Sequence, residues 1–140
     1  MRLLSAVCII GLIAATTVAA DAEKKDAEKK VAVAYFEALV NADETTANAL
    51  SSVPFSLDRK QILRTKAEVQ AAHKELIKNR EKGKVPKYTV ARTDKAAKLD
   101  AKVFPGYVVF RVTITVRDNK EHIDIYVSKG KSPMVIGFSD

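Results

Sequence analysis

Apolar side chains occupy every second position from Val108 to Val116, and the polar residues Arg111, Thr113 and Thr115 alternate with them. An alternation of this length indicates a β-strand with one buried face. Asp118-Asn119 follows as a two-residue turn, since both residues tolerate a positive φ better than most others. A second alternating run then continues to Val127. The pattern therefore predicts an antiparallel hairpin over residues 107–127.

The predicted turn sets the register of this hairpin. It pairs Arg117 with Lys120 and brings the apolar faces of the two strands together. The expected apolar pairs are Ile114 with Ile123, Val112 with Ile125, and Phe110 with Val127. The opposite, polar face carries Arg111, Thr113, Thr115, His122, Asp124 and Tyr126, with Asp124 opposite Thr113 and diagonal to Arg111.

Helical patterns precede the hairpin. Val31 to Ala42 has a wide apolar face, typical of a helix that packs on a core. Asp43 is placed to cap a short second helix that ends near Leu50. Thr65 to Glu68 forms a capping box, and the helix that it opens is expected to end near Gly83.

Short strands complete the domain. We expect strands at Val53–Leu57, Gln61–Leu63 and Tyr88–Ala91, and a last strand in which Met134, Ile136 and Phe138 alternate. Pro54 cannot donate to a strand ladder, so it should place its strand at a sheet edge or lie among its first residues. Helices gathered before a sheet indicate an α+β fold, with a curved antiparallel sheet wrapped around the helices.

The N-terminus has the features of a signal peptide, residues 1–20. Arg2 precedes an apolar segment, and Val18-Ala19-Ala20 fits a small-residue cleavage site. We expect cleavage after Ala20, export to a periplasm or out of the cell, and no integral membrane segment afterwards. An uncleaved N-terminal anchor is the alternative. Residues 21–30 form a charged helical lead-in, and residues 31–140 form one domain.

Composition narrows the chemistry of the exported chain. The only cysteine, Cys8, lies in the signal peptide, so neither a disulfide nor thiol chemistry is expected in the mature protein. The full chain of 140 residues has a net charge of +7. Fourteen Lys or Arg against six Asp or Glu lie between Asp58 and Lys102, with few aromatic side chains among them. We interpret them as a solvated face and expect no nucleic acid partner.

The order of these elements resembles that of a known superfamily. The stretch AYFEALVNADETTANALSSVPFSLD, followed by the helix that Thr65 opens, is similar to nuclear transport factor 2-like proteins, which include ketosteroid isomerases and polyketide cyclases. The resemblance covers essentially the whole mature chain. It implies a cone: a bent sheet and three helices, with the long first helix facing a pocket. Members are enzymes, binding modules or dimerisation domains, so the fold does not select among these functions.

The resemblance implies one set of candidate catalytic residues. In the isomerases, a tyrosine on the first helix and an acid on a late strand polarise a carbonyl, and a second carboxylate moves the proton. Tyr35, Asp124 and Asp58 match these positions in this chain. Such a site needs an apolar cavity that keeps one acid protonated. The expected hairpin register sets Asp124 near Arg111, which would keep it ionised and a poor donor.

Two further candidate sites would bind a ligand or a partner without catalysis. Tyr35, Phe55, Tyr88 and Phe110 are candidates to line a cavity for a small apolar ligand, or alternatively to fill the core. Arg111, His122 and Tyr126 are candidates for a homodimer interface on the polar sheet face, which is alternatively the solvated side of the sheet.

No residue pattern indicates a metal or another cofactor. His73 and His122 are the only histidines and fall on different elements, without the spacing of a metal site. No Walker, Rossmann or G-x-S-x-G motif occurs. The main expectation is an exported domain that binds a small ligand or a partner without demonstrable catalysis. The alternatives are an isomerase or lyase that uses Tyr35 and Asp58 on a small apolar carbonyl compound, and a structural dimerisation module.

Overall fold

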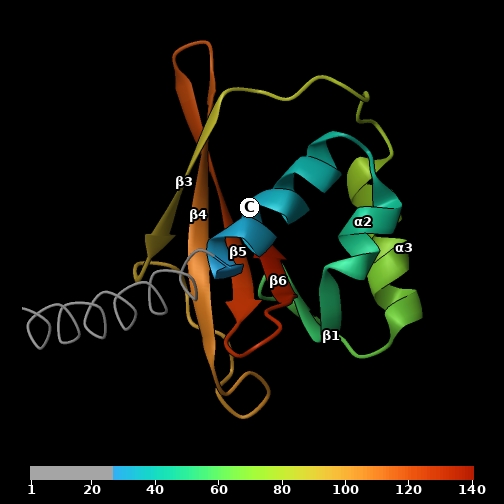
Figure 1. Cartoon of the computed structure of the whole chain (residues 1–140), viewed down its shortest axis with the longest axis vertical. Coiled ribbons are helices and arrows are strands. Elements are labelled where there is room, and N and C mark those ends of the chain that lie inside the picture. Colours follow the sequence, from blue (N-terminus) through green and yellow to red (C-terminus); the bar gives the residue numbers. More distant parts are fainter. Residues whose placement is uncertain (1–26) are drawn as a thin grey trace, which may run out of the picture.

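The computed structural model describes residues 27–140, and it has an α+β fold (Figure 1). The expected signal peptide lies outside the described residues, as does the lead-in up to residue 26. The elements are a first helix over residues 27–40, α2 (Glu44–Ala49), β1 (Ser51–Leu57), β2 (Gln61–Leu63), α3 (Lys66–Ile77), β3 (Tyr88–Thr93), β4 (Tyr107–Val116), β5 (Asn119–Ser128) and β6 (Val135–Ser139). No helix among residues 27–140 is long and apolar enough to cross a membrane.

The local signals for α2 and α3 are confirmed. The Asp43 carboxylate accepts a hydrogen bond from the backbone N–H of Thr46 at 3.1 Å and caps α2. Thr65 and Glu68 form the reciprocal bonds of a capping box at the start of α3. This helix ends at Ile77, earlier than the expected end near Gly83. Residues 78–84 are all exposed and include no large apolar side chain, so a longer helix would have had none to bury there.

The six strands form one curved, open sheet in the order β2-β1-β6-β5-β4-β3. All neighbours are antiparallel except β1 and β6, which are parallel. The sheet is therefore mixed, and the expectation of a purely antiparallel sheet was wrong. β1 lies inside the sheet, and the strand that contains Pro54 is not an edge strand. Pro54 falls within the register irregularity between Ser51 and Ser56, where the missing amide donor breaks no regular ladder.

The β4–β5 hairpin forms with a register different from the expected one. Val116 pairs with Asn119, so the turn is Arg117-Asp118, and Arg117 takes the positive φ of 53°. The pairs across the hairpin are Val112 with Ile123, Phe110 with Ile125, and Val108 with Val127. The difference is two residues, an even number that leaves each side chain on its expected face. It does move Asp124 from a position opposite Thr113 to one directly opposite Arg111.

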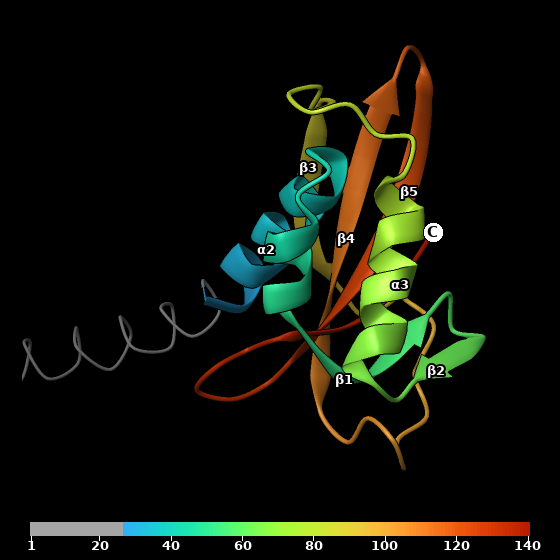
Figure 2. The same cartoon turned by 90° about the vertical axis from the view of Figure 1, so that its right-hand side faces the viewer.

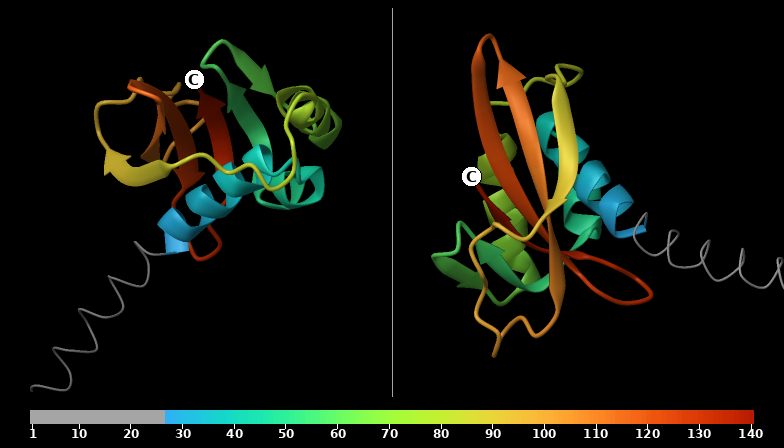
Figure 3. Two further views of the ribbon diagram at one scale, coloured as in Figure 1. Left: turned by 90° about the horizontal axis from the view of Figure 1, so that it is seen from above. Right: turned by 90° about the vertical axis from the view of Figure 1, so that its left-hand side faces the viewer.

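The three helices pack on one face of the sheet, here called the inner face (Figures 2 and 3). The main core lies between these layers and contains Tyr35, Phe36, Phe55, Phe110 and Phe138 among its aromatic members. On the first helix the buried side chains are Ala32, Tyr35, Phe36, Ala38, Leu39 and Val40, which agrees with the wide apolar face in the sequence. The core side of the first helix is therefore filled with side chains.

The opposite, outer face of the sheet carries a second, smaller cluster. Leu99 and Phe104 come from the segment between β3 and β4 and pack with Val109, Tyr126 and Ile136. Two tyrosines hold this segment. The Tyr126 hydroxyl donates to the carbonyl of Ala97 at 2.7 Å, and the backbone N–H of Leu99 donates to the Tyr107 hydroxyl at 2.8 Å. Part of the face expected to be solvated is thus covered by an irregular segment.

Strand β6 does not alternate as expected. Phe138 packs in the main core, whereas Ile136 packs in the outer cluster. The register between β5 and β6 shifts beside Val127, and this irregularity reverses the side of the following residues. Gly137 lies at the crossing, where an added Cβ would come within 3.1 Å of the Cβ of Ser56. A side chain at this position would have to push the neighbouring strands slightly apart.

Candidate functional site

A buried polar network crosses the main core between the first helix and α3. The hydroxyl of Tyr35 lies 2.9 Å from Nε2 of His73, and both side chains are fully buried. Phe55 completes the surroundings, with its ring centroid 6.5 Å from that of Tyr35 and 5.7 Å from that of His73. The polar pair is therefore enclosed by aromatic side chains, and its hydrogen bond is protected from water.

The network continues from His73 to Asn48 on α2. Nδ1 of His73 lies 2.6 Å from Oδ1 of Asn48. A carbonyl oxygen only accepts, so Nδ1 carries the proton, and in a neutral imidazole Nε2 is then the acceptor. The Tyr35 hydroxyl accordingly donates to Nε2. This arrangement satisfies both imidazole nitrogens, and it directs Oδ1 of Asn48 toward His73.

Burial keeps the network uncharged. Desolvation lowers the pKa of His73 to about 4, against a smaller opposing effect of Glu44. Burial also raises the pKa of the Tyr35 phenol above its ordinary value. At neutral pH both groups are neutral, so the bonds between them do not require the burial of a charge.

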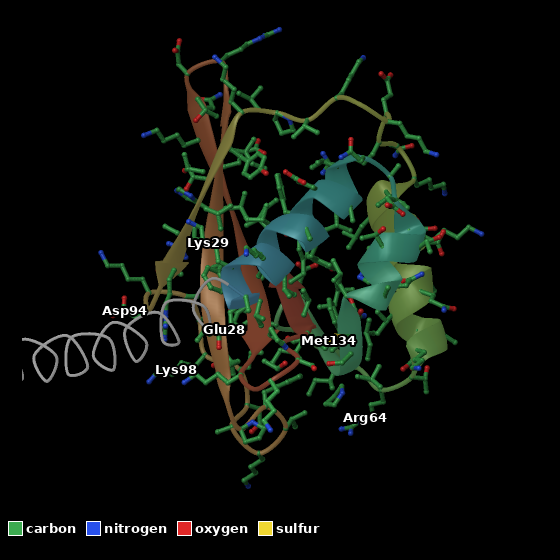
Figure 4. The ribbon with its side chains drawn as sticks, in the orientation of Figure 1. Glu28, Lys29, Arg64, Asp94, Lys98 and Met134 are labelled. Atoms are coloured by element: carbon green, nitrogen blue, oxygen red, sulfur yellow. The ribbon has the colours of Figure 1, made fainter. Side chains whose placement is uncertain are left out.

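A cavity of about 490 Å³ lies beside Asn48, on the side of α2 and α3 that meets β1. Its lining residues are Asn48, Ala49, Ser51, Ser52, Val53, Lys66, Val69, Gln70 and Met134. α3 contributes its N-terminal half, and the segment before β6 contributes Met134, which is labelled near β1 in Figure 4. Asn48 thus connects the buried network to the cavity, because its Oδ1 accepts from His73 and the residue also lines the cavity.

A second cavity, of about 690 Å³, lies at the outer cluster, between the segment after β3 and the start of β4. Its charged lining residues are Arg92, Asp94 and Lys98, all exposed (Figure 4 labels Asp94 and Lys98). It is larger than the cavity at Asn48, but the hydrogen bonds that reach it, to the Ala97 carbonyl and the Tyr107 hydroxyl, fix the irregular segment itself. At the smaller cavity, a lining side chain is instead held by the fully buried side chain of His73. The Asn48 cavity is therefore the better candidate site, despite its smaller volume.

The structure does not bring the expected catalytic residues together. Asp124 lies on the outer face, where its carboxylate receives two hydrogen bonds from Arg111, at 2.8 and 2.9 Å. Tyr35 lies on the inner face, with its hydroxyl bonded to His73. Asp58 lies in the turn after β1 with a φ of 50°, and its backbone N–H donates to the carbonyl of Phe138 at 2.8 Å. Tyr35 and Asp124 thus lie on opposite sides of the sheet.

The residues expected to line a pocket instead fill the core or its edge. Tyr35, Phe55 and Phe110 are buried in the main cluster. Tyr88 is half-buried and donates to the Glu37 carboxylate at 2.6 Å, a bond that, with burial, raises the pKa of Tyr88 to about 12. None of these four residues lines either cavity described above. Tyr35, Phe55 and Phe110 therefore fill the core, which was the alternative interpretation of the sequence.

The expected interface residues lie in three different environments. Tyr126 is only 1% exposed, because the segment after β3 covers it, so it is not available on a free sheet face. Arg111 retains 31% of its side-chain exposure and is paired with Asp124. His122 is exposed, with Nδ1 3.2 Å from the Thr113 hydroxyl. Only the part of the outer face nearer the hairpin tip is open to solvent.

Sequence reasoning missed the residues that build the site. In the sequence, His73 stood out only as one of two histidines without the spacing of a metal site, whereas in the structure it is fully buried. Its presence among Val69 and Ile77 on the apolar face of α3 was the available signal, because a polar residue there needs a partner. Asn48 carried no comparable signal, since its partner lies 25 positions away in the sequence. Within residues 27–140, no group of three or more His, Cys, Asp or Glu is arranged to hold a metal ion.

No protein-family model matches the chain, and no curated protein is significantly similar to it.

Proposed function

We propose that the chain is an exported, single-domain binding protein of the nuclear transport factor 2-like type. The order of its elements supports this proposal: a helix, a short helix, a β-hairpin, a capped helix, and strands that complete a curved, open sheet. All three described helices lie on one face of that sheet, as a cone requires. Residues 1–20 support export through their apolar segment and small-residue cleavage site.

The proposed function is the binding of a small, largely apolar ligand in the Asn48 cavity. The observation that carries it is a cavity of about 490 Å³ in which one lining side chain, Asn48, is fixed by a hydrogen bond to the buried His73. Ligand sites in proteins commonly span about 300–1,000 Å³ and combine apolar walls with a few fixed polar groups. Val53, Val69 and Met134 supply apolar wall, and Asn48 is the fixed polar group.

Binding is favoured over catalysis by the enclosure of the reactive side chains. Tyr35 and His73 have no exposed surface, so a substrate in the cavity cannot contact either ring. A general acid or base must come within hydrogen-bond reach of the proton that it transfers. The pair therefore acts on the cavity through Asn48, as a support for that side chain.

The experiment is a titration of the mature protein with sodium octanoate, followed by amide chemical shifts. The largest changes should fall on residues that line the cavity, among them Asn48, Gln70 and Met134. Gln70→Trp should weaken binding about tenfold by occupying the cavity mouth. Ala71→Trp is the matched control, since Ala71 is exposed on the same helix and does not line the cavity. Shift changes confined to other regions, or equal affinity in both variants, would contradict the proposal.

Export has its own test. The full chain, produced with its N-terminus in a secreting bacterial host, should be recovered outside the cytoplasm with Asp21 as its first residue. N-terminal sequencing or intact mass reads this position directly. A protein that keeps Met1 and sediments with membranes would instead support the uncleaved anchor.

A further inference from the structure

We propose that the ligand of the Asn48 cavity is an apolar molecule that ends in a carboxylate, a hydrogen-bond acceptor with a negative charge. This inference rests on the proposed binding function and names its ligand class. Three features carry it: the orientation of the Asn48 amide, the charge of the cavity lining, and the apolar side chains of that lining.

The orientation of the amide follows from the buried network. The buried Tyr35 hydroxyl has no hydrogen-bond partner among residues 27–140 other than Nε2 of His73, so its proton goes to that nitrogen. Nδ1–H of His73 then occupies Oδ1 of Asn48. The amide nitrogen of Asn48, with two N–H groups, is then the end left for a ligand. An N–H donor selects an acceptor and offers nothing to an ammonium group. Tyr35 and His73 are thus positioning residues for this selectivity.

The charge of the lining points to the same class. Lys66 is the one ionisable side chain among the lining residues, and no carboxylate lines the cavity. Lys66 is also the first residue of α3, where the helix dipole favours negative charge. The nearby carboxylate of Glu68 instead accepts from the backbone N–H groups of Arg64 and Thr65, at 2.7 and 2.9 Å. An anionic end therefore meets an amide donor and a cation.

The remaining wall suits a hydrocarbon body. Val53, Val69 and Met134 line the cavity from β1, α3 and the segment before β6. Val69 is 5% exposed, so the wall is continuous with the main core. A ligand that covers these side chains gains from the burial of apolar surface, and its acceptor end supplies orientation.

The test compares three ligands of equal chain length by titration calorimetry on the mature protein: octanoate, octanol and octylamine. Octanoate should bind about tenfold more tightly than octylamine, with octanol between them, because only octanoate can use both the amide donor and the Lys66 charge. Equal affinities for the three ligands would overturn the inference and leave the proposed function standing. Absence of binding by all three at millimolar concentration would overturn both.

Variants separate the contributing groups. Asn48→Asp keeps an acceptor for His73 and replaces the amide donor, so it should weaken octanoate binding about tenfold or more and spare octanol. Lys66→Gln should weaken octanoate binding severalfold at low salt, with a smaller effect at high salt. Lys74→Gln is the matched control on the same helix, exposed and away from the lining. Unchanged octanoate affinity in Asn48→Asp would contradict the inference.

A third variant tests the positioning role of Tyr35. Tyr35→Phe removes the donor that fixes the His73 tautomer, so the Asn48 amide loses its enforced orientation. The ratio of octanoate to octylamine affinity should fall, which a loss of stability alone would not cause, since both ligands use the same cavity. An unchanged ratio in a folded Tyr35→Phe protein would overturn the role of the network.

Discussion

The two faces of the sheet each bury a tyrosine, but they hold it in different ways. On the inner face, Tyr35 donates to His73, a side chain of a regular helix that is itself fully buried. On the outer face, Tyr126 donates to the backbone carbonyl of Ala97, in the irregular segment between β3 and β4. The inner bond lies among helices and strands that pack together. The outer bond is formed by an irregular segment at the molecular surface.

The difference has an energetic consequence. A polar atom that loses its partner on the inner face has no water to replace it, and the full cost of its desolvation remains. A carbonyl in a surface segment can be hydrated after a small movement. The inner face should therefore be rigid and sensitive to substitution, and the outer face more tolerant. Matched substitutions on the two faces should show this difference for aromatic rings, histidines and tyrosine hydroxyls, in order of decreasing effect, and an ion pair of the outer face should contribute least.

Truncation of a buried aromatic ring should separate the faces most clearly. Phe55→Ala should lower the free energy of unfolding by about 3–5 kcal/mol, because it leaves a cavity between the first helix, α3 and β1. Phe104→Ala, in the outer cluster, should cost less than about 3 kcal/mol, since the surface segment can collapse onto the space. Urea denaturation measures both losses. Equal losses would show that the two faces are packed with the same rigidity.

The stability of the protein should depend on pH through His73. Its pKa is about 4 in the folded protein, below the ordinary 6.5 of the unfolded chain. The unfolded state therefore binds the proton first, and stability falls as the pH is lowered from about 6.5 toward about 4. This residue should shift the unfolding equilibrium by up to about tenfold per pH unit in that window.

The two histidines allow a matched control for this effect. His73→Gln should flatten the pH dependence of urea unfolding between pH 6.5 and 4. His122→Gln should leave it unchanged, because His122 is exposed on the outer face. A pH dependence that is the same in both variants would mean that His73 is not the group responsible.

Removal of the two tyrosine hydroxyls should have a moderate, unequal effect. Tyr35→Phe should cost about 1–3 kcal/mol, because Nε2 of His73 is left buried without a donor. Tyr126→Phe should cost about 1 kcal/mol, since the freed carbonyl of Ala97 can be hydrated. Urea denaturation at neutral pH distinguishes them. A larger loss for Tyr126→Phe would reverse the comparison of the faces.

The smallest effect is expected at the ion pair of the outer face. Arg111 and Asp124 make a bidentate contact, and their side chains are 31% and 15% exposed. Partly exposed pairs contribute little, so a double-mutant cycle with Arg111→Ala and Asp124→Ala should give a coupling of about 1 kcal/mol or less. The coupling should shrink in 1 M salt. A coupling above about 2 kcal/mol that does not change with salt would show that the pair behaves as a buried ion pair, and would contradict this prediction.

Local signals predicted much of the fold from the sequence. The Asp43 cap, the capping box at Thr65 and the alternation of β4 each depend on neighbouring residues, and each forms as expected. The hairpin turn was misplaced by one position, because the apolar alternation is equally satisfied when the register changes by two residues. The parallel pairing of β1 with β6 was also missed, since it joins segments from opposite ends of the domain.

The site was harder to predict than the fold. Its polar network joins residues from the first helix, α2 and α3, and no spacing in the sequence encodes that convergence. The aromatic residues expected to line a pocket do belong to the main core or pack against it. Their hydrophobicity alone could not show whether their rings surround a cavity or fill the space between the helices and the sheet. The cover over Tyr126 likewise came from a polar segment, residues 93–102, whose few apolar side chains gave little indication of packing.

The protonation of His73 tests the central claim most directly, because the orientation of Asn48 depends on it. Long-range proton–nitrogen correlation spectra of the mature protein at pH 7 distinguish the imidazole nitrogen that carries the proton. We predict a neutral ring with the proton on Nδ1, unchanged down to about pH 5 and retained when octanoate is bound. A proton on Nε2, or a charged ring at pH 7, would contradict the network and the ligand selectivity that follows from it.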